Sequence, residues 1–209
     1  MASSFSIQIP AIVYLLQQLK PSTVLDIGKG FGKYGFLIHE YAGIDNRERI
    51  NPALSMAEQS AIKVDAVEAD KDLLLPHLNQ VYSNIFIGDV FEIYKRLQQY
   101  DLILMIDVIE HLDKAKAIEL LKYFLAKNSI LIIATPLHFF KQELYKSEFE
   151  QHISHWKLND LKSLGRVEYQ YFDGGAIYLL SNDKINIRGF GNSLIKKIRR
   201  IAKSVRNEV

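Results

Sequence analysis

Residues 24–32 read VLDIGKGFG, an apolar run that leads directly into three closely spaced glycines. Residues 24–27 are typical of a short buried strand, and the pattern that follows, as far as about Glu40, is typical of a helix. Glycines let a backbone turn sharply and approach a ligand closely, while a helix N-terminus presents free N–H groups. The stretch therefore predicts a strand, a ligand-binding loop and a helix in succession.

Strand and helix patterns alternate through the rest of the chain. Further strands are predicted at residues 62–68, 85–87, 101–106 and 130–134, and helices at residues 10–20, 70–78, 91–98, 115–126 and 156–164. A final pair of strands, 167–172 and 176–180, flanks a tight turn and is expected to form an antiparallel hairpin. This order predicts an α/β fold, a three-layer sandwich around a mostly parallel seven-stranded sheet, with ligands at the carboxyl ends of the strands.

Composition excludes several classes of protein. The chain has 209 residues, of which 48% are apolar and 24% charged, so intrinsic disorder is excluded and one main domain is expected, over residues 1–187. It contains no cysteine, which excludes disulfides, iron–sulfur clusters, thiolate zinc sites and cysteine nucleophiles. No apolar run approaches the roughly 18 residues of a membrane span, and the N-terminus lacks a signal-peptide pattern. We therefore expect a cytoplasmic location.

Positive charge is concentrated at the C-terminus. Residues 188–209 hold seven basic residues and one acid, which leaves 19 basic and 23 acidic residues in the remainder of the chain. Apolar residues recur at helical spacing between the basic ones, at Leu194, Ile198, Ile201 and Val205. The pattern predicts a basic amphipathic helix, which can lie on anionic lipid, bind nucleic acid or dock on its own domain. No aromatic residue follows Phe190 to stack on bases, so nucleic acid is the least favoured of the three.

The spacing of the glycines distinguishes between nucleotide cofactors. A dinucleotide-binding loop follows G-x-G-x-x-G, which requires glycine where this chain has Lys33. The order from Asp26 is instead D-x-G-x-G-x-G. It resembles motif I of the class I, Rossmann-like S-adenosylmethionine-dependent methyltransferases, in which this loop wraps the methionine part of the cofactor. The resemblance covers about residues 10–181 and implies a methyltransferase enzyme with S-adenosylmethionine as cofactor.

Three further motifs resemble the same family, in order along the chain. Glu68 matches the acid at the end of the second strand, which accepts hydrogen bonds from both ribose hydroxyls, and Asp89 matches the third-strand acid, which accepts from the adenine amino group. Residues 101–112, DLILMIDVIEHL, match the fourth-strand motif, which places Asp107 near the methyl group. The resemblance thus assigns cofactor binding to Asp26, Gly28, Gly30, Gly32, Glu68, Asp89 and Asp107.

Two positions in this region depart from the family pattern. Glu68 lies 42 residues after Asp26, where about 20 is usual, whereas Asp45 lies 19 residues after it. We prefer Glu68 because it ends a strand pattern and Asp45 does not, and we place the additional length in an insertion at residues 42–61. Lys29 occupies a loop position that is commonly small in the family. Its ammonium group is expected to face water rather than the cofactor.

Asp107 and His111 are the candidate catalytic residues. Methyl transfer from a sulfonium is an in-line displacement, so alignment and the exclusion of water supply most of the acceleration, and a general base is optional. His111 stands four residues after Asp107, where it would act as a base or contact the acceptor. The alternative interpretation is that His111 caps a helix or packs near Asp113.

The segment after the fifth strand, residues 137–156, is rich in polar and aromatic residues. It resembles the segment that covers the acceptor pocket in a group of bacterial and archaeal methyltransferases. Its Phe139, Phe140 and Tyr145 would then form an apolar wall. Trp156 is expected to anchor the following helix in the core.

The same segment carries a weak signal for a metal site. Glu150, His152 and His155 offer one carboxylate and two imidazoles, but no H-E-x-x-H pairing supports them, so no metal is expected.

The sequence therefore predicts a methyltransferase that transfers a methyl group from S-adenosylmethionine to a small-molecule, sugar or lipid-linked acceptor. Peripheral contact with a membrane through residues 188–209 is part of this hypothesis. The alternatives are a nucleic-acid-directed or non-catalytic relative and, less favoured because of Lys33 and the final hairpin, an NAD-dependent oxidoreductase.

Overall fold

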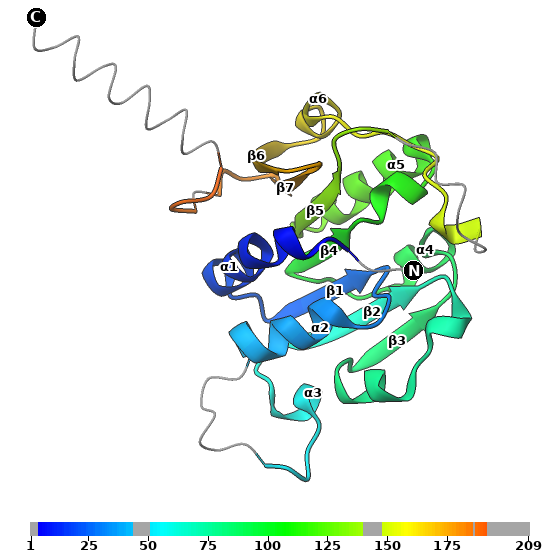
Figure 1. The fold of residues 1–209 in the computed structure, drawn as a ribbon, viewed down its shortest axis with the longest axis vertical. Coiled ribbons are helices and arrows are strands. Elements are labelled where there is room, and N and C mark those ends of the chain that lie inside the picture. Colours follow the sequence, from blue (N-terminus) through cyan, green and yellow to red (C-terminus); the bar gives the residue numbers. More distant parts are fainter. Residues whose placement is uncertain (1–3, 44–50, 140–147, 186, 192–209) are drawn as a thin grey trace, which may run out of the picture.

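A seven-stranded sheet forms the centre of the molecule (Figure 1). The computed structural model describes residues 4–43, 51–139, 148–185 and 187–191. The strands are β1 Thr23–Ile27, β2 Lys63–Glu68, β3 Asn84–Ile87, β4 Leu102–Ile106, β5 Ile130–Pro136, β6 Arg166–Phe172 and β7 Gly175–Ser181. Their order across the sheet is β3-β2-β1-β4-β5-β7-β6.

The strand directions confirm the predicted topology. β1 pairs in parallel with both β2 and β4, and the parallel pairing continues outward to β3 and β5. β7 then runs antiparallel to both β5 and β6, as the hairpin pattern predicts. The chain order reverses between β1 and β4, which is the place where doubly wound sheets open a crevice for a ligand.

Helices cover both faces of the sheet. The helices are α1 Ile9–Leu19, α2 Lys33–Ile38, α3 Met56–Gln59, α4 Val90–Ile93, α5 Lys114–Ala126 and α6 Leu158–Lys162. Because successive strand residues point to opposite faces, Leu25 and Ile103 pack on the side of α4 and α5, whereas Val24 and Leu102 pack on the side of α1 and α2. The result is the three-layer α/β sandwich that the sequence predicts.

The predicted helix at residues 70–78 is wrong. Two short 3₁₀ turns, Lys71–Leu73 and Pro76–Gln80, stand there instead. Leu75 is extended between them, with φ −92° and ψ 145°, because the ring of a following proline disfavours helical backbone. The Asp70 side chain accepts from the Asp72 backbone and so caps a single turn only.

Other elements differ from the prediction mainly in length. The helix expected at residues 91–98 is the short α4 followed by a 3₁₀ turn, Tyr94–Arg96, and the helix expected at 156–164 is confined to α6. The insertion at residues 42–61 contains α3, which begins with Ser55 and Glu58 in a reciprocal capping box. Asp45 lies outside the described residues.

The chain remains packed on the domain beyond residue 187. Phe190 is buried with the apolar residues of α1, and the Tyr14 hydroxyl of that helix donates to the backbone carbonyl of Arg188. Residues 192–209 lie outside the described ranges, so the basic amphipathic helix stays a prediction. None of the helices in those ranges combines the length and apolar character needed to cross a bilayer.

Candidate functional site

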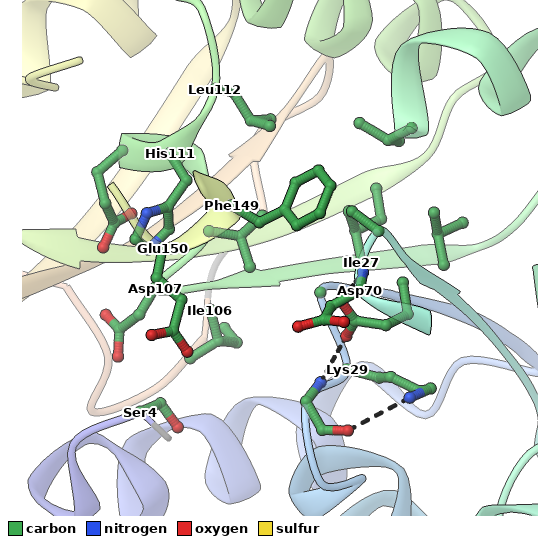
Figure 2. A pocket seen from close by; sticks show the side chains of 18 of the residues that line it. Ser4, Ile27, Lys29, Asp70, Ile106, Asp107, His111, Leu112, Phe149 and Glu150 are labelled. Carbon is green, nitrogen blue, oxygen red and sulfur yellow. Dashed lines mark hydrogen bonds between the residues drawn. The ribbon is translucent and has the colours of Figure 1, made fainter. Parts of the chain in front are cut away.

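A pocket of about 510 Å³ lies at the carboxyl ends of the central parallel strands (Figure 2). It brings together residues from the ends of β1, β2 and β4 with the loops that follow them. Of the predicted site residues, seven line it: Asp26, Gly28, Gly30, Glu68, Asp89, Asp107 and His111. The structure thus gathers most of the predicted site at the crevice where the sheet order reverses.

The glycine loop has the geometry that the sequence predicts. Gly28 has φ +71°, and a Cβ built on it would meet a Val108 methyl carbon at 2.5 Å. Any larger residue would therefore combine a strained backbone with a steric clash. The Gly28 N–H donates to the Val67 carbonyl at 2.8 Å, which ties the loop to the neighbouring strand β2.

Gly32 has a structural place rather than a place in the pocket. It is the N-cap of α2 with φ +83°, and a Cβ there would lie 2.5 Å from a Leu78 methyl carbon. Gly32 does not line the pocket described above. Its assignment to cofactor binding stays a prediction, and the structure shows that its missing side chain lets α2 begin close to Leu78.

Glu68 ends β2 and faces the glycine loop. Its side chain is buried, with Oε2 accepting from the Gly30 N–H at 3.0 Å and Oε1 accepting from the Asp70 N–H at 3.1 Å. Because each carboxylate oxygen has two lone pairs, both remain able to accept a further hydrogen bond. β2, the strand that Glu68 ends, pairs in parallel with β1, as the choice of Glu68 over Asp45 requires.

Lys29 does not face water, contrary to the prediction. Its residue is 4% exposed, and its Nζ donates to the Leu73 carbonyl at 2.8 Å and to the Gly30 carbonyl at 3.3 Å. Burial lowers the pKa of this ammonium group, and the carboxylate of Glu68 opposes that effect. Lys29 therefore holds the glycine loop against the 3₁₀ turn after β2.

Asp26 and Asp89 each have a structural hydrogen bond. Asp26 accepts from the Tyr82 hydroxyl at 2.6 Å, and burial raises the pKa of its carboxyl group to about 7. Asp89 caps α4 by accepting from the Phe91 N–H at 2.8 Å. Both line the pocket, so their assignment to cofactor binding stays a prediction compatible with their position.

Asp107 is held at the end of β4 in a left-handed backbone conformation, with φ +53°. Its Oδ2 accepts from the Gln8 side chain at 2.7 Å and from the Phe5 N–H at 3.4 Å. Its Oδ1 is buried and has no hydrogen-bond partner among the described residues. Burial raises the pKa of this carboxyl group.

His111 lies on the same side of the pocket as Asp107 and Glu150 (Figure 2). Its Nδ1 lies 3.1 Å from the Gln151 carbonyl, which can only accept a hydrogen bond, so Nδ1 carries the proton and Nε2 presents a lone pair. Burial lowers the pKa of the ring, which favours this neutral form. The bond to Gln151 is also what a packing role would give, so the catalytic role of His111 stays a prediction.

The segment 151–156 is fastened to the turn that carries His111. The N–H groups of Ile153 and Ser154 both donate to the Glu110 carbonyl, at 2.9 and 3.0 Å. Trp156 is buried, as expected, and its Nε1 donates to the Ile109 carbonyl. These bonds hold the backbone that follows His152 against the turn at Ile109–His111.

Glu110 is a pocket residue that the sequence prediction missed. Its carboxyl group is 3% exposed, Oε2 accepts from the Thr135 hydroxyl at 3.2 Å, and Oε1 is buried without a partner in the described structure. Burial, with a smaller contribution from the charge of Asp107, raises its pKa to about 8. The adjacent His111 was the only sequence signal for it.

The structure does not group Glu150, His152 and His155, the set that the sequence analysis judged too weak to be a metal site. His155 Nε2 lies 2.9 Å from the Leu137 carbonyl and takes no part in the group around His152. Among the described residues, one ligand atom each from Glu110, His111 and His152 lie within 4.8 Å of one another. The rings of His111 and His152 meet edge to face with centroids 4.9 Å apart.

Comparison with known proteins places the chain in a family. Residues 9–171 match the family model described as a methyltransferase domain. The chain belongs to this methyltransferase family. No curated protein matches it. Family membership and the fold confirm the predicted class I, S-adenosylmethionine-dependent methyltransferase.

Solved structures of methyltransferases share the fold at low identity. A SAM-dependent methyltransferase from Archaeoglobus fulgidus is 18% identical with a TM-score of 0.55, covering 95% of this chain and 85% of its own. An O-methyltransferase family protein from Burkholderia thailandensis is 9% identical with a TM-score of 0.57, covering 86% of this chain and 57% of its own. The small RNA methyltransferase HEN1 is 17% identical with a TM-score of 0.57, and the match covers 91% of this chain but 27% of HEN1.

Proposed function

We propose that this methyltransferase transfers the methyl group of S-adenosylmethionine to a small-molecule, sugar or lipid-linked acceptor bound beside Asp107 and His111. The observation that carries the proposal is one pocket lined by the glycine loop, Glu68, Asp107 and His111, in which Lys29 of the loop lies on the opposite side from Asp107 and His111 (Figure 2). A donor and an acceptor held on these two sides would meet in line, which is the main requirement of a displacement reaction.

The cofactor end of the pocket has suitable groups for each part of S-adenosylmethionine. When bound, this cofactor supplies a methyl group on a positively charged sulfur, an excellent leaving group. Gly28 and Gly30 let the cofactor approach the backbone of the loop closely. Glu68 accepts from the ribose hydroxyls, and Asp89 accepts from the adenine amino group.

The charge of the pocket supports a cationic donor. Eight carboxylic residues line it against three lysines, and the acids remain in excess near pH 7 even with Glu110 mostly protonated and Asp26 about half protonated. A negative potential attracts the sulfonium and amino groups of the cofactor and repels a phosphate backbone. The negative potential of the pocket therefore favours a small acceptor over nucleic acid.

Exposed apolar side chains at the pocket support an acceptor with an apolar part. Phe5, Phe149 and Ile153 line the pocket and are 59%, 49% and 58% exposed. Phe5 and Ser4 are positioned by bonds to the site, since the Phe5 N–H donates to Asp107 and Lys33 Nζ donates to the Ser4 carbonyl at 2.8 Å. A bound acceptor would cover these side chains and exclude water from the reacting atoms.

His111 and Asp107 supply the chemistry of the acceptor end. The Nε2 lone pair of neutral His111 can accept the proton of an acceptor hydroxyl or amine as the acceptor atom forms its bond to the methyl carbon. The electron pair of the breaking carbon–sulfur bond remains on sulfur. Asp107 either orients the acceptor or stabilises the positive charge that develops on the imidazole.

A methyl-transfer assay against separate pools tests the acceptor class. Purified full-length protein is incubated with S-adenosylmethionine labelled in the methyl group and with small metabolites, sugars, a lipid extract or total RNA. We expect label in one of the first three pools and not in RNA. Label in RNA alone, or in none of the pools, would contradict the proposal.

The same assay tests His111. The His111→Gln variant is expected to lower the transfer rate by roughly 10²–10⁴-fold, the usual contribution of a general base. His138→Gln is the matched control, because His138 is exposed and does not line the pocket.

A nucleic-acid acceptor is the second candidate, favoured by the six basic residues of 192–209 and by the similarity in fold to a small RNA methyltransferase. This hypothesis predicts RNA binding that weakens steeply with salt and disappears when residues 192–209 are deleted. Truncation after Gly191 is preferable to truncation after residue 187, because Phe190 packs in the core. Equal RNA binding by the 209-residue chain and by the chain truncated after Gly191, or no RNA binding by either, would rule out a nucleic-acid acceptor.

A further inference from the structure

Three side chains in the acceptor half of the pocket form a cluster of a kind that binds metal ions. Glu110, His111 and His152 each offer one oxygen or nitrogen atom, and these atoms lie within 4.8 Å of one another. Tetrahedral ligand atoms at about 2.1 Å from a cation lie about 3.4 Å apart, so side-chain rotations that move these atoms by about 1 Å would complete the site.

His111 has the orientation of a metal ligand. Metal-binding histidines typically donate their other ring N–H to a backbone carbonyl or carboxylate, which fixes the ring and its tautomer. Here Nδ1 of His111 is bonded to the Gln151 carbonyl at 3.1 Å, and Nε2 is left as the donor atom.

Glu110 provides a second, independent indication. Its residue is 3% exposed, and Oε1 has no hydrogen-bond partner among the described residues. A buried carboxylate oxygen without a partner is costly, and bound water, a cation or a ligand commonly satisfies such an atom. The other oxygen is oriented by the Thr135 hydroxyl, as ligating carboxylates usually are.

His152 reaches the cluster from a different segment, but its backbone is firmly held. The two neighbouring N–H groups, of Ile153 and Ser154, donate to the carbonyl of Glu110 itself. The Ser154 hydroxyl also donates to the Ile109 carbonyl at 3.0 Å. The fold therefore fixes the third ligand relative to the other two before any ion is bound.

We propose that Glu110, His111 and His152 bind one divalent transition-metal cation, such as Zn²⁺ or Mn²⁺, at the acceptor end of the pocket. Two imidazole nitrogens and one carboxylate oxygen suit this class of ion, whereas Mg²⁺ and Ca²⁺ prefer oxygen alone. Three protein ligands leave at least one coordination position open, as in catalytic metal sites. The buried Oδ1 of Asp107 lies in the same pocket as a further candidate ligand.

The open position would receive an oxygen of the methyl acceptor. This part of the inference rests on the proposed function, while the binding of the ion does not. With the ion bound, Nε2 of His111 becomes a ligand and no longer accepts a proton. The cation instead lowers the pKa of a coordinated acceptor hydroxyl, whose proton passes to solvent before the oxygen bonds to the methyl carbon and the electron pair of the carbon–sulfur bond stays on sulfur. An acceptor with a hydroxyl or a pair of neighbouring hydroxyls is the class that this site fits.

Calorimetric titration of the chelator-treated full chain with Zn²⁺, Mn²⁺ and Mg²⁺, each alone, tests the site. We expect one equivalent of Zn²⁺ or Mn²⁺ to bind, and the Glu110→Gln and His152→Gln variants to bind it more than about tenfold more weakly. His155→Gln is the matched control and should bind as the wild type does, because the His155 ring contacts the Leu137 carbonyl.

Retained binding of S-adenosylhomocysteine by each variant shows that its pocket is folded. No binding of Zn²⁺ or Mn²⁺ by the wild type, or equal loss in His155→Gln, would overturn the metal site. Neither result depends on methyl transfer, so failure of the metal site is distinguishable from failure of the proposed function. If the ion binds but does not alter transfer to any acceptor, the assigned role of the open position is wrong.

Discussion

Single side chains at the carboxyl ends of the strands have two tasks in this protein, because they both hold the loops and face the pocket. Glu68 illustrates this, since its two oxygens bind the N–H groups of Gly30 and Asp70 while its carboxylate lines the pocket. The glycine loop is therefore ordered around the same carboxylate that is predicted to bind the ribose.

Replacement of Glu68 by alanine is expected to weaken the binding of S-adenosylhomocysteine by at least about 100-fold. The change removes charge-assisted hydrogen bonds to the ribose and releases the loop at Gly30, and each such bond contributes roughly 1.5–3 kcal/mol. Calorimetry measures the effect, with Asp45→Ala as the control. Greater weakening by the control would mean that the ribose-binding acid was assigned to the wrong segment.

Asp26 is expected to make stability depend on pH. Burial raises the pKa of its carboxyl group from 3.8 to about 7, so between these values the folded protein binds more protons than the unfolded chain. This contribution to stability is complete below about pH 4 and is lost as the pH rises through 7. The free energy of unfolding should therefore fall with rising pH in this window, by at most about 1.4 kcal/mol per pH unit.

The Asp26→Asn variant isolates this effect. Asparagine keeps an oxygen that accepts from the Tyr82 hydroxyl but cannot ionise. Denaturant unfolding at a series of pH values should show a weaker dependence for the variant than for the wild type between pH 4 and 7. Parallel pH profiles for the two proteins would contradict the assigned ionisation.

At the scale of elements, the segment 151–156 determines the acceptor end by its docking on the turn at Ile109–His111. Trp156 contributes a buried ring and a donor to the Ile109 carbonyl. Trp156→Phe removes that donor and part of the packing, so we expect the free energy of unfolding to fall by about 1–3 kcal/mol. Chemical denaturation measures the change, and Tyr171→Phe at an exposed position should alter it by less than about 0.5 kcal/mol. Equal effects would show that the docking contributes little.

The strands were predictable because hydrophobic runs and turn residues mark them locally. β4 is buried at all five positions, and its apolar run predicts this directly. The region after β2 was predicted wrongly because apolar residues at helical spacing outweighed the one local signal against a helix, Pro76, which holds Leu75 extended. The local hydrophobic pattern identified the layers of the fold but not the conformation of the connection between β2 and β3.

The candidate site was predictable where strand ends determine it. Glu68, Asp89 and Asp107 follow strands, and parallel strands bring their carboxyl ends to one edge of the sheet. The burial of Lys29 and the meeting of Glu110 with His152 depend on contacts between distant segments. Such contacts leave no periodic signal in a single sequence.

At the scale of the whole molecule, charge is divided between an acidic domain and a basic C-terminal segment. The domain carries the carboxylate-lined pocket, and residues 192–209 carry six basic residues and one acid. The two parts are suited to different partners, a cationic cofactor for the pocket and an anionic surface for the segment.

Deletion of residues 192–209 is expected to leave the affinity for S-adenosylhomocysteine unchanged and to abolish binding to vesicles containing anionic lipid. Each basic residue near such a surface contributes about 1 kcal/mol at moderate salt. Vesicle co-sedimentation measures this, with neutral vesicles as the control. Binding that survives the deletion would place the lipid-binding surface on the domain itself.

The central claim is that the pocket at the ends of β1, β2 and β4 binds S-adenosylmethionine for methyl transfer. Calorimetric titration of the purified chain with S-adenosylhomocysteine, with NADH as a parallel ligand, tests it most directly. We predict micromolar, one-to-one binding of S-adenosylhomocysteine and none of NADH. Binding of NADH alone would contradict the assignment of the glycine loop, and binding of neither ligand would contradict the claim that this pocket is the cofactor site.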